Sequence, residues 1–119
     1  MNQQKNLAKE KTINWSIVDQ GKFDRINRIQ LPQGSKTKLK CNWDRKKHVY
    51  VNKGSCWVKL PNTDVLLEQG DSIDLQLGEA HQFENTGLTH LELIEIERMV
   101  LPSELEIEAL EESLEQSRV

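Results

Sequence analysis

The chain has 119 residues, of which 36% are hydrophobic and 29% are charged, and a formal net charge of −3 at pH 7. This length suits one domain with its own core, and the hydrophobic content lies above that of disordered chains. No apolar run has the length of a membrane span or of a signal-peptide core, so we expect a cytoplasmic protein with no membrane partner. Cys41 and Cys56 lack a C-x-x-C spacing, and in a reducing compartment we expect both to be free thiols.

The charges are divided along the chain. Residues 36–53 hold seven Lys or Arg and one acid, Asp44, whereas residues 103–119 hold six Glu and one Arg. A basic segment attracts phosphate, but a solvated strand edge kept soluble by lysines has the same composition. Only Trp43 and Tyr50 are aromatic within the segment. Two aromatic residues are weak support for base stacking, so no nucleic-acid partner is expected.

Nine short segments with β-type alternation follow one another along the chain. They are residues 13–18, 24–31, 36–41, 48–51, 55–60, 64–68, 71–77, 81–85 and 90–97. Turn sequences separate them, among them PQG at 32–34, NKG at 52–54, PNTD at 61–64 and NTG at 85–87. Short strands at this spacing predict an all-β sandwich or barrel. The absence of a helix of crossover length between them argues against a parallel α/β sheet.

The last alternating segment changes parity. Leu91 and Leu93 stand at odd positions, whereas Ile94 and Ile96 stand at even positions. Either a β-bulge or a strand that is covered on both faces accounts for this pattern. The sequence does not choose between them.

A helix is predicted after Pro102. Ser103 and Glu106 have the spacing of a capping box, and apolar residues then recur at helical intervals, at Ile107, Leu110 and Leu114. We expect this acidic helix to lie over the barrel or against a partner subunit. The predicted plan is a flexible arm at 1–12, or an edge strand exchanged with another copy, then a barrel at 13–101 and the helix at 102–119.

Residues 40–51, KCNWDRKKHVYV, combine a β-type pattern with polar residues. In an extended strand, Asn42, Asp44 and His48 share one face, while Val49 and Val51 take the other. The polar face indicates a metal site, the remains of one, or a polar strand without a special function.

A later stretch, GDSIDLQLGEAHQFEN at 70–85, resembles the second signature of the cupin family. Gly70, Gly78, His81 and Asn85 stand at the spacing of that signature, and Gln76 replaces its proline. NRIQLPQG at 27–34, NWDRKKHVYVNKG at 42–54 and THLELIEIE at 89–97 are similar to motifs of type II mannose-6-phosphate isomerases, a group that includes the cupin domain of bifunctional mannose-1-phosphate guanylyltransferase/isomerase enzymes. The resemblance runs from Trp15 to Glu97 and implies the cupin double-stranded β-helix, a jelly-roll-like barrel followed here by the C-terminal helix.

The resemblance also implies a metal site. In cupins, one strand supplies three ligands and the second signature supplies the fourth, which places the ligands here at Asn42, Asp44, His48 and His81. Two imidazoles and one carboxylate suit Fe²⁺, and they also suit Zn²⁺ or Mn²⁺ in an open site. Lys47 replaces a glutamate of the family motif, and strict alternation directs it away from the ligands. If no metal binds, the two histidines are polar residues in a wet barrel mouth.

A sugar-phosphate ligand and a homodimer follow from the same resemblance. Arg45 matches an arginine of the family motif, and a guanidinium can grip phosphate bidentately, although alternation directs Arg45 away from the ligand face. Asp44 is a candidate base for moving a proton between sugar carbons, provided that it is not a metal ligand. Three interpretations stay open: a sugar-phosphate binder or isomerase, a metal-dependent oxygenase, and a non-catalytic binding or assembly module.

Overall fold

A computed structural model of the protein describes residues 12–117. Over that range the chain forms the strands β1 (Asn14–Gln20), β2 (Asp24–Leu31), β3 (Arg45–Lys53), β4 (Cys56–Lys59), β5 (Asp64–Leu67), β6 (Ser72–Leu75), β7 (Gln82–Glu84) and β8 (Leu91–Met99), followed by the helix α2 (Pro102–Ser117). Each strand overlaps a predicted segment, because alternation of apolar and polar residues is what a sheet with one buried face requires, although β3 is longer than the predicted 48–51. Of the predicted arm at 1–12, residues 1–11 lie outside the described range.

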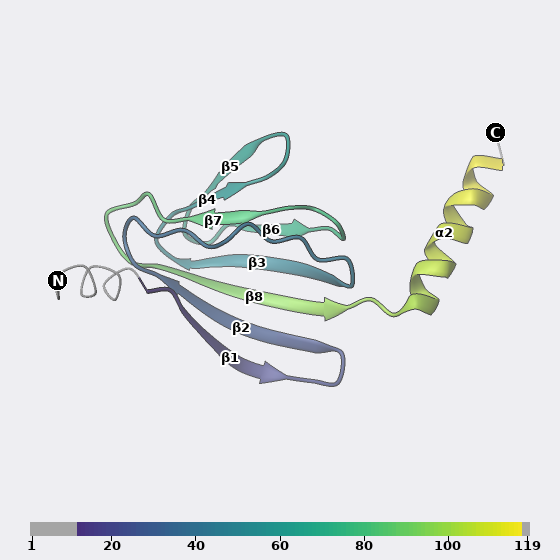
Figure 1. Cartoon of the computed structure of the whole chain (residues 1–119), viewed down its shortest axis with the longest axis horizontal. Helices are drawn as coiled ribbons and strands as arrows, with labels where there is room; N and C mark the ends of the chain where they lie inside the picture. Colours follow the sequence, from purple (N-terminus) through teal and green to yellow (C-terminus); the bar gives the residue numbers. More distant parts are fainter. Residues whose placement is uncertain (1–11, 118–119) are drawn as a thin grey trace.

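The strands form two antiparallel sheets that face each other (Figure 1). The larger sheet has the order β1-β2-β8-β3-β6 and the smaller one has the order β5-β4-β7. We call the space between the two sheets the barrel interior. At the edge of the larger sheet, all seven residues of β1 are exposed, so the interior is open on that side.

The apolar core fills one end of the barrel interior. Both sheets contribute to it, with Ile29, Leu31, Val49, Val51, Cys56, Val58, Leu67, Leu75, Phe83, Leu91 and Leu93. The strand register brings these side chains together, since Ile29 pairs with Leu93 and Leu31 pairs with Leu91. Full burial of one such side chain contributes about 1.5–3 kcal/mol relative to exposure. This end of the barrel is therefore a packed scaffold that supports the polar residues at the other end.

Residues 36–41 form no continuous strand, in contrast to the prediction. They run beside β7 and make only isolated bridges, from Lys36 to Glu84 and from Lys40 to His81. Between the bridges, the hydroxyl of Thr37 accepts the backbone N–H of Phe83 at 2.9 Å. A side chain thus takes the place of a backbone acceptor and interrupts the ladder.

The parity change in β8 is not a bulge in its pairing with β2. Those two strands keep one register along their whole contact. The inner face continues from Leu91 and Leu93 to Glu95 and Glu97, all four of which are buried. Ile96 points the other way and is 43% exposed. The apolar isoleucines therefore face outward, and the glutamates face the barrel interior.

Two residues of the second cupin signature have structural roles. Gly78 has a φ of +72°, and a Cβ atom there would clash with the ring of Trp43, so the turn requires glycine. Asn85 is fully buried, and its amide nitrogen donates to the carbonyl oxygens of Leu31 and Thr89, each at 2.9 Å. The signature thus holds the turns at both ends of β7 in place.

The helix α2 extends away from the sheets (Figure 1). Its apolar residues Ile107, Leu110 and Leu114 are each more than half exposed, so they do not cover the barrel. An exposed ion pair of 3.4 Å joins Glu108 to Lys46 of β3, and such pairs contribute little to stability. Packing of this helix against a partner subunit stays a prediction. Among the described residues, no helix is both long and apolar enough to span a bilayer.

Candidate functional site

Five charged or polar side chains occupy the end of the barrel interior opposite the core. We call Arg25, Asn27, Lys47, Glu95 and Glu97 the polar layer. The sheet register places them side by side, because Arg25 and Lys47 both pair with Glu97, from opposite sides of β8, and Asn27 pairs with Glu95. Arg25 is half-buried, and the other four are buried. Three adjacent strands thus change from apolar to polar at the same level.

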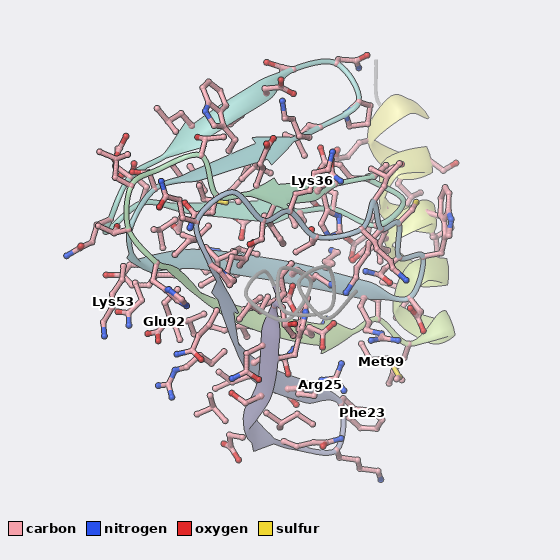
Figure 2. The ribbon with its side chains drawn as sticks, turned by 60° about the vertical axis from the view of Figure 1, so that its left-hand side comes forward. Phe23, Arg25, Lys36, Lys53, Glu92 and Met99 are labelled. Atoms are coloured by element: carbon pink, nitrogen blue, oxygen red, sulfur yellow. The ribbon has the colours of Figure 1, made fainter. Side chains whose placement is uncertain are left out.

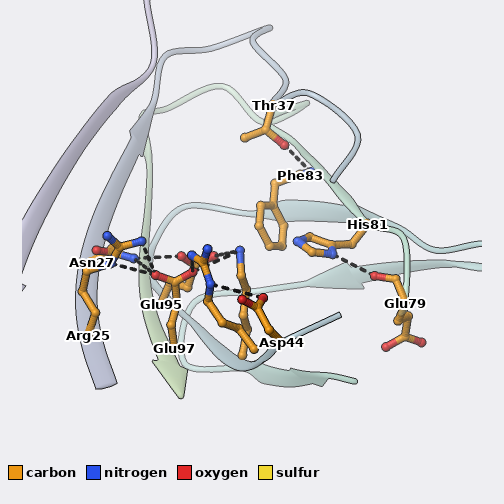
Figure 3. A network of polar contacts seen from close by, with 11 residues as sticks. Arg25, Asn27, Thr37, Asp44, Glu79, His81, Phe83, Glu95 and Glu97 are labelled. Carbon is orange, nitrogen blue, oxygen red and sulfur yellow. Dashed lines mark hydrogen bonds and ion pairs between the residues drawn. The ribbon is translucent and has the colours of Figure 1, made fainter. Parts of the chain in front are cut away.

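Short contacts connect the polar layer (Figure 3). Lys47 Nζ lies 3.3 Å from Glu95 Oε2 and 3.5 Å from Glu97 Oε1. Arg25 donates from Nε at 2.8 Å and from Nη2 at 2.6 Å to Glu97 Oε2. Asn27 Nδ2 donates to Glu95 Oε1 at 3.0 Å and to Glu97 Oε2 at 2.9 Å. Buried charges require this degree of pairing, because an isolated ion in a protein interior is strongly disfavoured.

The surroundings of Glu97 keep its carboxylate charged. Burial raises the pKa of this group, but hydrogen bonds from Arg25 and Asn27 and the charge of Lys47 outweigh burial, and the net pKa is lowered. Glu97 is therefore a fixed negative charge that contacts three cations, Arg25, Arg45 and Lys47.

His81 faces the polar layer from the opposite sheet. Its Nδ1 lies 3.0 Å from the carbonyl oxygen of Glu79; because a carbonyl only accepts, Nδ1 carries the hydrogen and Nε2 is the acceptor. Nε2 is buried without a hydrogen-bond partner in the described structure, and Figure 3 shows it turned toward the polar layer. Burial lowers the pKa of His81; the Glu79 hydrogen bond opposes this, and the charge of Lys47 adds to it. The imidazole is thus neutral near pH 7.

Arg45 lines a cavity of about 230 Å³ at the end of the β1–β2 hairpin, together with Phe23, Arg25, Glu97 and Met99 among others. Figure 2 shows Phe23, Arg25 and Met99 at this end of the molecule. Arg45 Nη1 lies 3.4 Å from Glu97 Oε1, which is longer than the ~2.7–2.9 Å of a strong charge-assisted hydrogen bond. Its Nε is buried without a hydrogen bond. The guanidinium therefore makes one long hydrogen bond, to Glu97, and an ion pair with Asp44 at 3.6 Å.

Lysines gather beside Trp15 at the open side of the barrel. Trp15 lines a second cavity, of about 300 Å³, with Lys36, Lys38 and Lys40. Lys40 Nζ lies 4.0 Å from the centre of the Trp15 ring, which is a cation–π contact. Burial lowers the pKa of Lys40, and the charge of Lys47 lowers it further. The open side thus presents positive charge to an incoming anion.

The structure does not bring the four predicted metal ligands together. His48 lies on the outer face of β3, where its Nδ1 is 2.6 Å from Asp74 Oδ1 and its side chain is 44% exposed. Asn42 precedes the strand, and the side chain of Asp44 is 61% exposed, whereas His81 is buried inside. Over residues 12–117, no group of three His, Cys, Asp or Glu side chains is placed to hold a metal ion.

This placement corrects the prediction of which face of β3 points into the barrel. Alternation rightly separates His48 from Val49, but the valine face is the interior face, and Arg45 and Lys47 share its parity. The strand β3 begins only at Arg45, so strand alternation does not determine the direction of the side chains of Asn42 and Asp44. The residues present do not fit a metal ion, because an ammonium group stands inside the barrel where the family motif carries a glutamate.

The structure also reveals site residues that the sequence interpretation did not single out. Arg25, Asn27, Glu95 and Glu97 each continue the parity of the apolar residues on the same strand. This shared parity was the sequence signal that these four side chains face the barrel interior.

Comparison with known proteins places this architecture in a family. The family model described as mannose-6-phosphate isomerase C-terminal matches residues 4–112. The chain belongs to this family. A putative mannose-1-phosphate guanylyltransferase from Vibrio cholerae is 31% identical over 80 residues, which are 67% of this chain and 17% of that protein. The matched part therefore spans less than a fifth of that relative's length.

Two solved structures resemble the fold of this mannose-6-phosphate isomerase family member. The Cnp3 cupin domain of Schizosaccharomyces pombe has a TM-score of 0.71 at 11% identity and covers 74% of this chain and 65% of that chain. A sugar phosphate isomerase of the cupin superfamily from Silicibacter pomeroyi has a TM-score of 0.60 at 18% identity, over 66% of this chain and 52% of that chain. At these identities the likeness concerns the fold, and the predicted cupin barrel is confirmed.

Proposed function

We propose that the chain binds a phosphorylated sugar at the polar end of the barrel. The observation that carries the proposal is the cavity where Arg45, Arg25 and Glu97 lie together. Phosphate is well matched by a guanidinium, and sugar hydroxyls are well matched by carboxylates. The cavity volume of about 230 Å³ is below the ~300–1,000 Å³ of drug-sized pockets, which favours a ligand of sugar-phosphate size.

Arg45 is the better phosphate ligand of the two arginines. Arg25 already uses two donors on Glu97, at 2.8 and 2.6 Å. Arg45 has only longer contacts, at 3.4 Å to Glu97 and 3.6 Å to Asp44. In the proposal Arg25 therefore holds the carboxylate in place, and Arg45 turns toward the phosphate.

Family membership supports the choice of ligand. The matching family is named for mannose 6-phosphate isomerisation, and the Vibrio cholerae relative is named for a reaction of mannose 1-phosphate. Both names contain a mannose phosphate. We extend this ligand class to the present chain as part of the proposal.

Aldose–ketose isomerisation is the reaction we propose for this ligand. It moves a proton from one sugar carbon to its neighbour, which requires a base near the carbons and a positive group near the carbonyl oxygen. Asp44 is an exposed carboxylate beside Arg45 and is accessible as the base. Because Arg45 binds the phosphate in this proposal, Lys47 would supply the positive group, and the proposed step uses side chains of this chain alone.

A non-catalytic binding module is the second candidate. It is favoured by the position of His48, which points away from His81, so that the implied metal-dependent chemistry has no assembled ligand set among the described residues. The oxygenase interpretation requires Asp44, His48 and His81 on one metal ion. The same placement gives it no support.

The test measures binding and turnover together. Calorimetry should show that mannose 6-phosphate binds and that unphosphorylated mannose binds at least about tenfold more weakly, because the phosphate contact is lost. Arg45→Gln should weaken binding of mannose 6-phosphate by a similar factor, whereas Arg28→Gln, on the outer face of β2, should not. Formation of fructose 6-phosphate, abolished by Asp44→Asn, would establish the isomerase. Binding without turnover would leave the binding module, and equal binding of mannose with and without phosphate would contradict both.

A further inference from the structure

The interior of this barrel carries a lysine where the family motif has a glutamate. Lys47 lies on the inner face of β3, with a side-chain exposure of 4%. Its ammonium group is fixed by Glu95 and Glu97, and Arg25 and Asn27 in turn fix those carboxylates. The surrounding side chains are therefore arranged to bind a cation that belongs to the protein itself, the Lys47 ammonium.

The charges of the site disfavour a second cation. Arg25, Arg45 and Lys47 supply three positive charges against the two negative charges of Glu95 and Glu97, and all three contact these carboxylates. A divalent metal ion would meet the Lys47 ammonium directly, and both carboxylates are already engaged. Two like charges held this close repel more strongly in a protein interior than in water, because the local dielectric constant is lower.

A buried polar atom that faces the polar layer nevertheless lacks a hydrogen-bond partner in the described structure. His81 Nε2 is buried without a hydrogen-bond partner in the described structure, whereas Glu95 Oε2 is engaged in the 3.3 Å ion pair with Lys47 Nζ. Figure 3 shows the His81 ring turned toward the polar layer. The contacts of Lys47 Nζ are long, at 3.3 and 3.5 Å. The acceptor at His81 and the ammonium donor at Lys47 are thus available to a group that both donates and accepts hydrogen bonds, which is the pattern of a sugar hydroxyl.

Taken together, these observations point to a site that works without metal. We infer that Lys47 replaces the family metal ion as the cation of the site, and that its ammonium donates to a hydroxyl oxygen of the ligand while His81 Nε2 accepts the hydrogen of that hydroxyl. The identity of that ligand as a sugar phosphate rests on the proposed function. The absence of a metal requirement rests on the polar layer alone.

The first test concerns metal. Equilibrium dialysis of the whole protein against Mn²⁺, Zn²⁺ and Fe²⁺ should show no stoichiometric binding that depends on His81. Lys47→Glu removes the cation and adds a third carboxylate near His81, so this variant should gain binding of Mn²⁺ or Zn²⁺, and adding His81→Ala should weaken it about tenfold or more. Stoichiometric metal in the unmodified protein that is lost in His81→Ala would overturn the inference, whether or not Lys47→Glu folds.

The second test concerns the ligand. Binding of mannose 6-phosphate should change less than about twofold in excess chelator, and Lys47→Gln should weaken it about tenfold or more, with circular dichroism to verify the fold. Lys46→Gln, a neighbouring lysine paired with the helix, is the matched control and should bind normally. Loss of binding in chelator that metal restores would overturn the inference and support the proposed function. No sugar-phosphate binding under any condition would sink the proposed function, and the dialysis would still decide the metal question.

Discussion

The Lys47 ammonium and the Glu95 carboxylate lie 3.3 Å apart inside the barrel, with side-chain exposures of 4% and 0%. Each partner has lost its hydration, so each depends on the other. The strand pattern is reversed here relative to a typical core, since apolar Ile96 faces solvent while Glu95 faces inward.

Removing the positive partner should destabilise the fold. Lys47→Met leaves Glu95 and Glu97 without their shared cation, and breaking a buried ion pair in this way costs about 3–5 kcal/mol. Urea denaturation at pH 7 measures the loss. The double variant Lys47→Met/Glu95→Gln should recover part of it, because no unpaired charge then remains at Glu95. Lys46→Met is the control and should stay within about 0.5 kcal/mol; similar losses for both lysine variants would refute the argument.

Glu97 should make the fold sensitive to acid. Its folded-state pKa is below the usual value of 4.5, so its contribution to stability is fully present above about pH 4.5 and is lost as the pH falls through the folded-state pKa. Glu97→Gln should therefore show a smaller decrease in the free energy of unfolding between pH 6 and pH 3 than the parent chain. Glu111→Gln, on an exposed position of α2, serves as the comparison. Parallel stability curves for the parent and Glu97→Gln would count against the role of Glu97.

His81 should make the free energy of unfolding depend on pH in a higher pH range than Glu97 does. Burial holds its folded-state pKa below 6.5, so the unfolded chain takes up a proton first as the pH falls. The free energy of unfolding should therefore decrease below about pH 6.5, and His81→Gln should remove this part of the pH dependence. NMR titration of the His81 ring provides the direct measurement, with His48→Gln as the control for stability. A midpoint at or above 6.5 would contradict the assigned environment.

Asn85 should matter for stability and not for chemistry. Asn85→Ala leaves the carbonyl groups of Leu31 and Thr89 without the donor that each has at 2.9 Å. The expected loss is about 1–3 kcal/mol, because the Leu31 carbonyl is buried and a buried acceptor without a partner costs this much, whereas Thr89 is exposed and its carbonyl can bind water. Thermal denaturation should show a clear decrease for this variant and almost none for Thr86→Ala, an exposed neighbour. Ligand affinity of the folded fraction should be unchanged, and a selective loss of affinity would place Asn85 in the site instead.

The sequence predicted the fold well because alternation and turns act locally. The predicted segments at 24–31 and 64–68 coincide closely with β2 and β5, since each has an apolar face and a turn sequence at its ends. Residues 36–41 have the same alternation, yet the Thr37 hydroxyl takes a ladder position. That substitution depends on which strand lies alongside, and a single sequence does not contain this information.

The site was harder to predict, because polar residues occupy core positions. Strict parity from Val49 and Val51 leads to Lys47, but a lysine is seldom buried, and His48 seemed the more natural ligand. Glu95 and Glu97 were missed for the same reason, because the neighbouring apolar residues Ile94 and Ile96 seemed the more natural core residues. Burial of these charges is possible only because β2, β3 and β8 align them in register, and this pairing follows from topology.

Trp15 is an intrinsic fluorescent probe of the open side of the barrel. Its indole ring lies 4.0 Å from the Lys40 ammonium and is 39% exposed, so both charge and water act on its emission. An anionic ligand that attracts Lys40 would move this cation off the ring and change the fluorescence spectrum. Binding of an anionic ligand at the open side of the barrel can therefore be followed by fluorescence without an added label, once Trp43 and Trp57 have been replaced by phenylalanine.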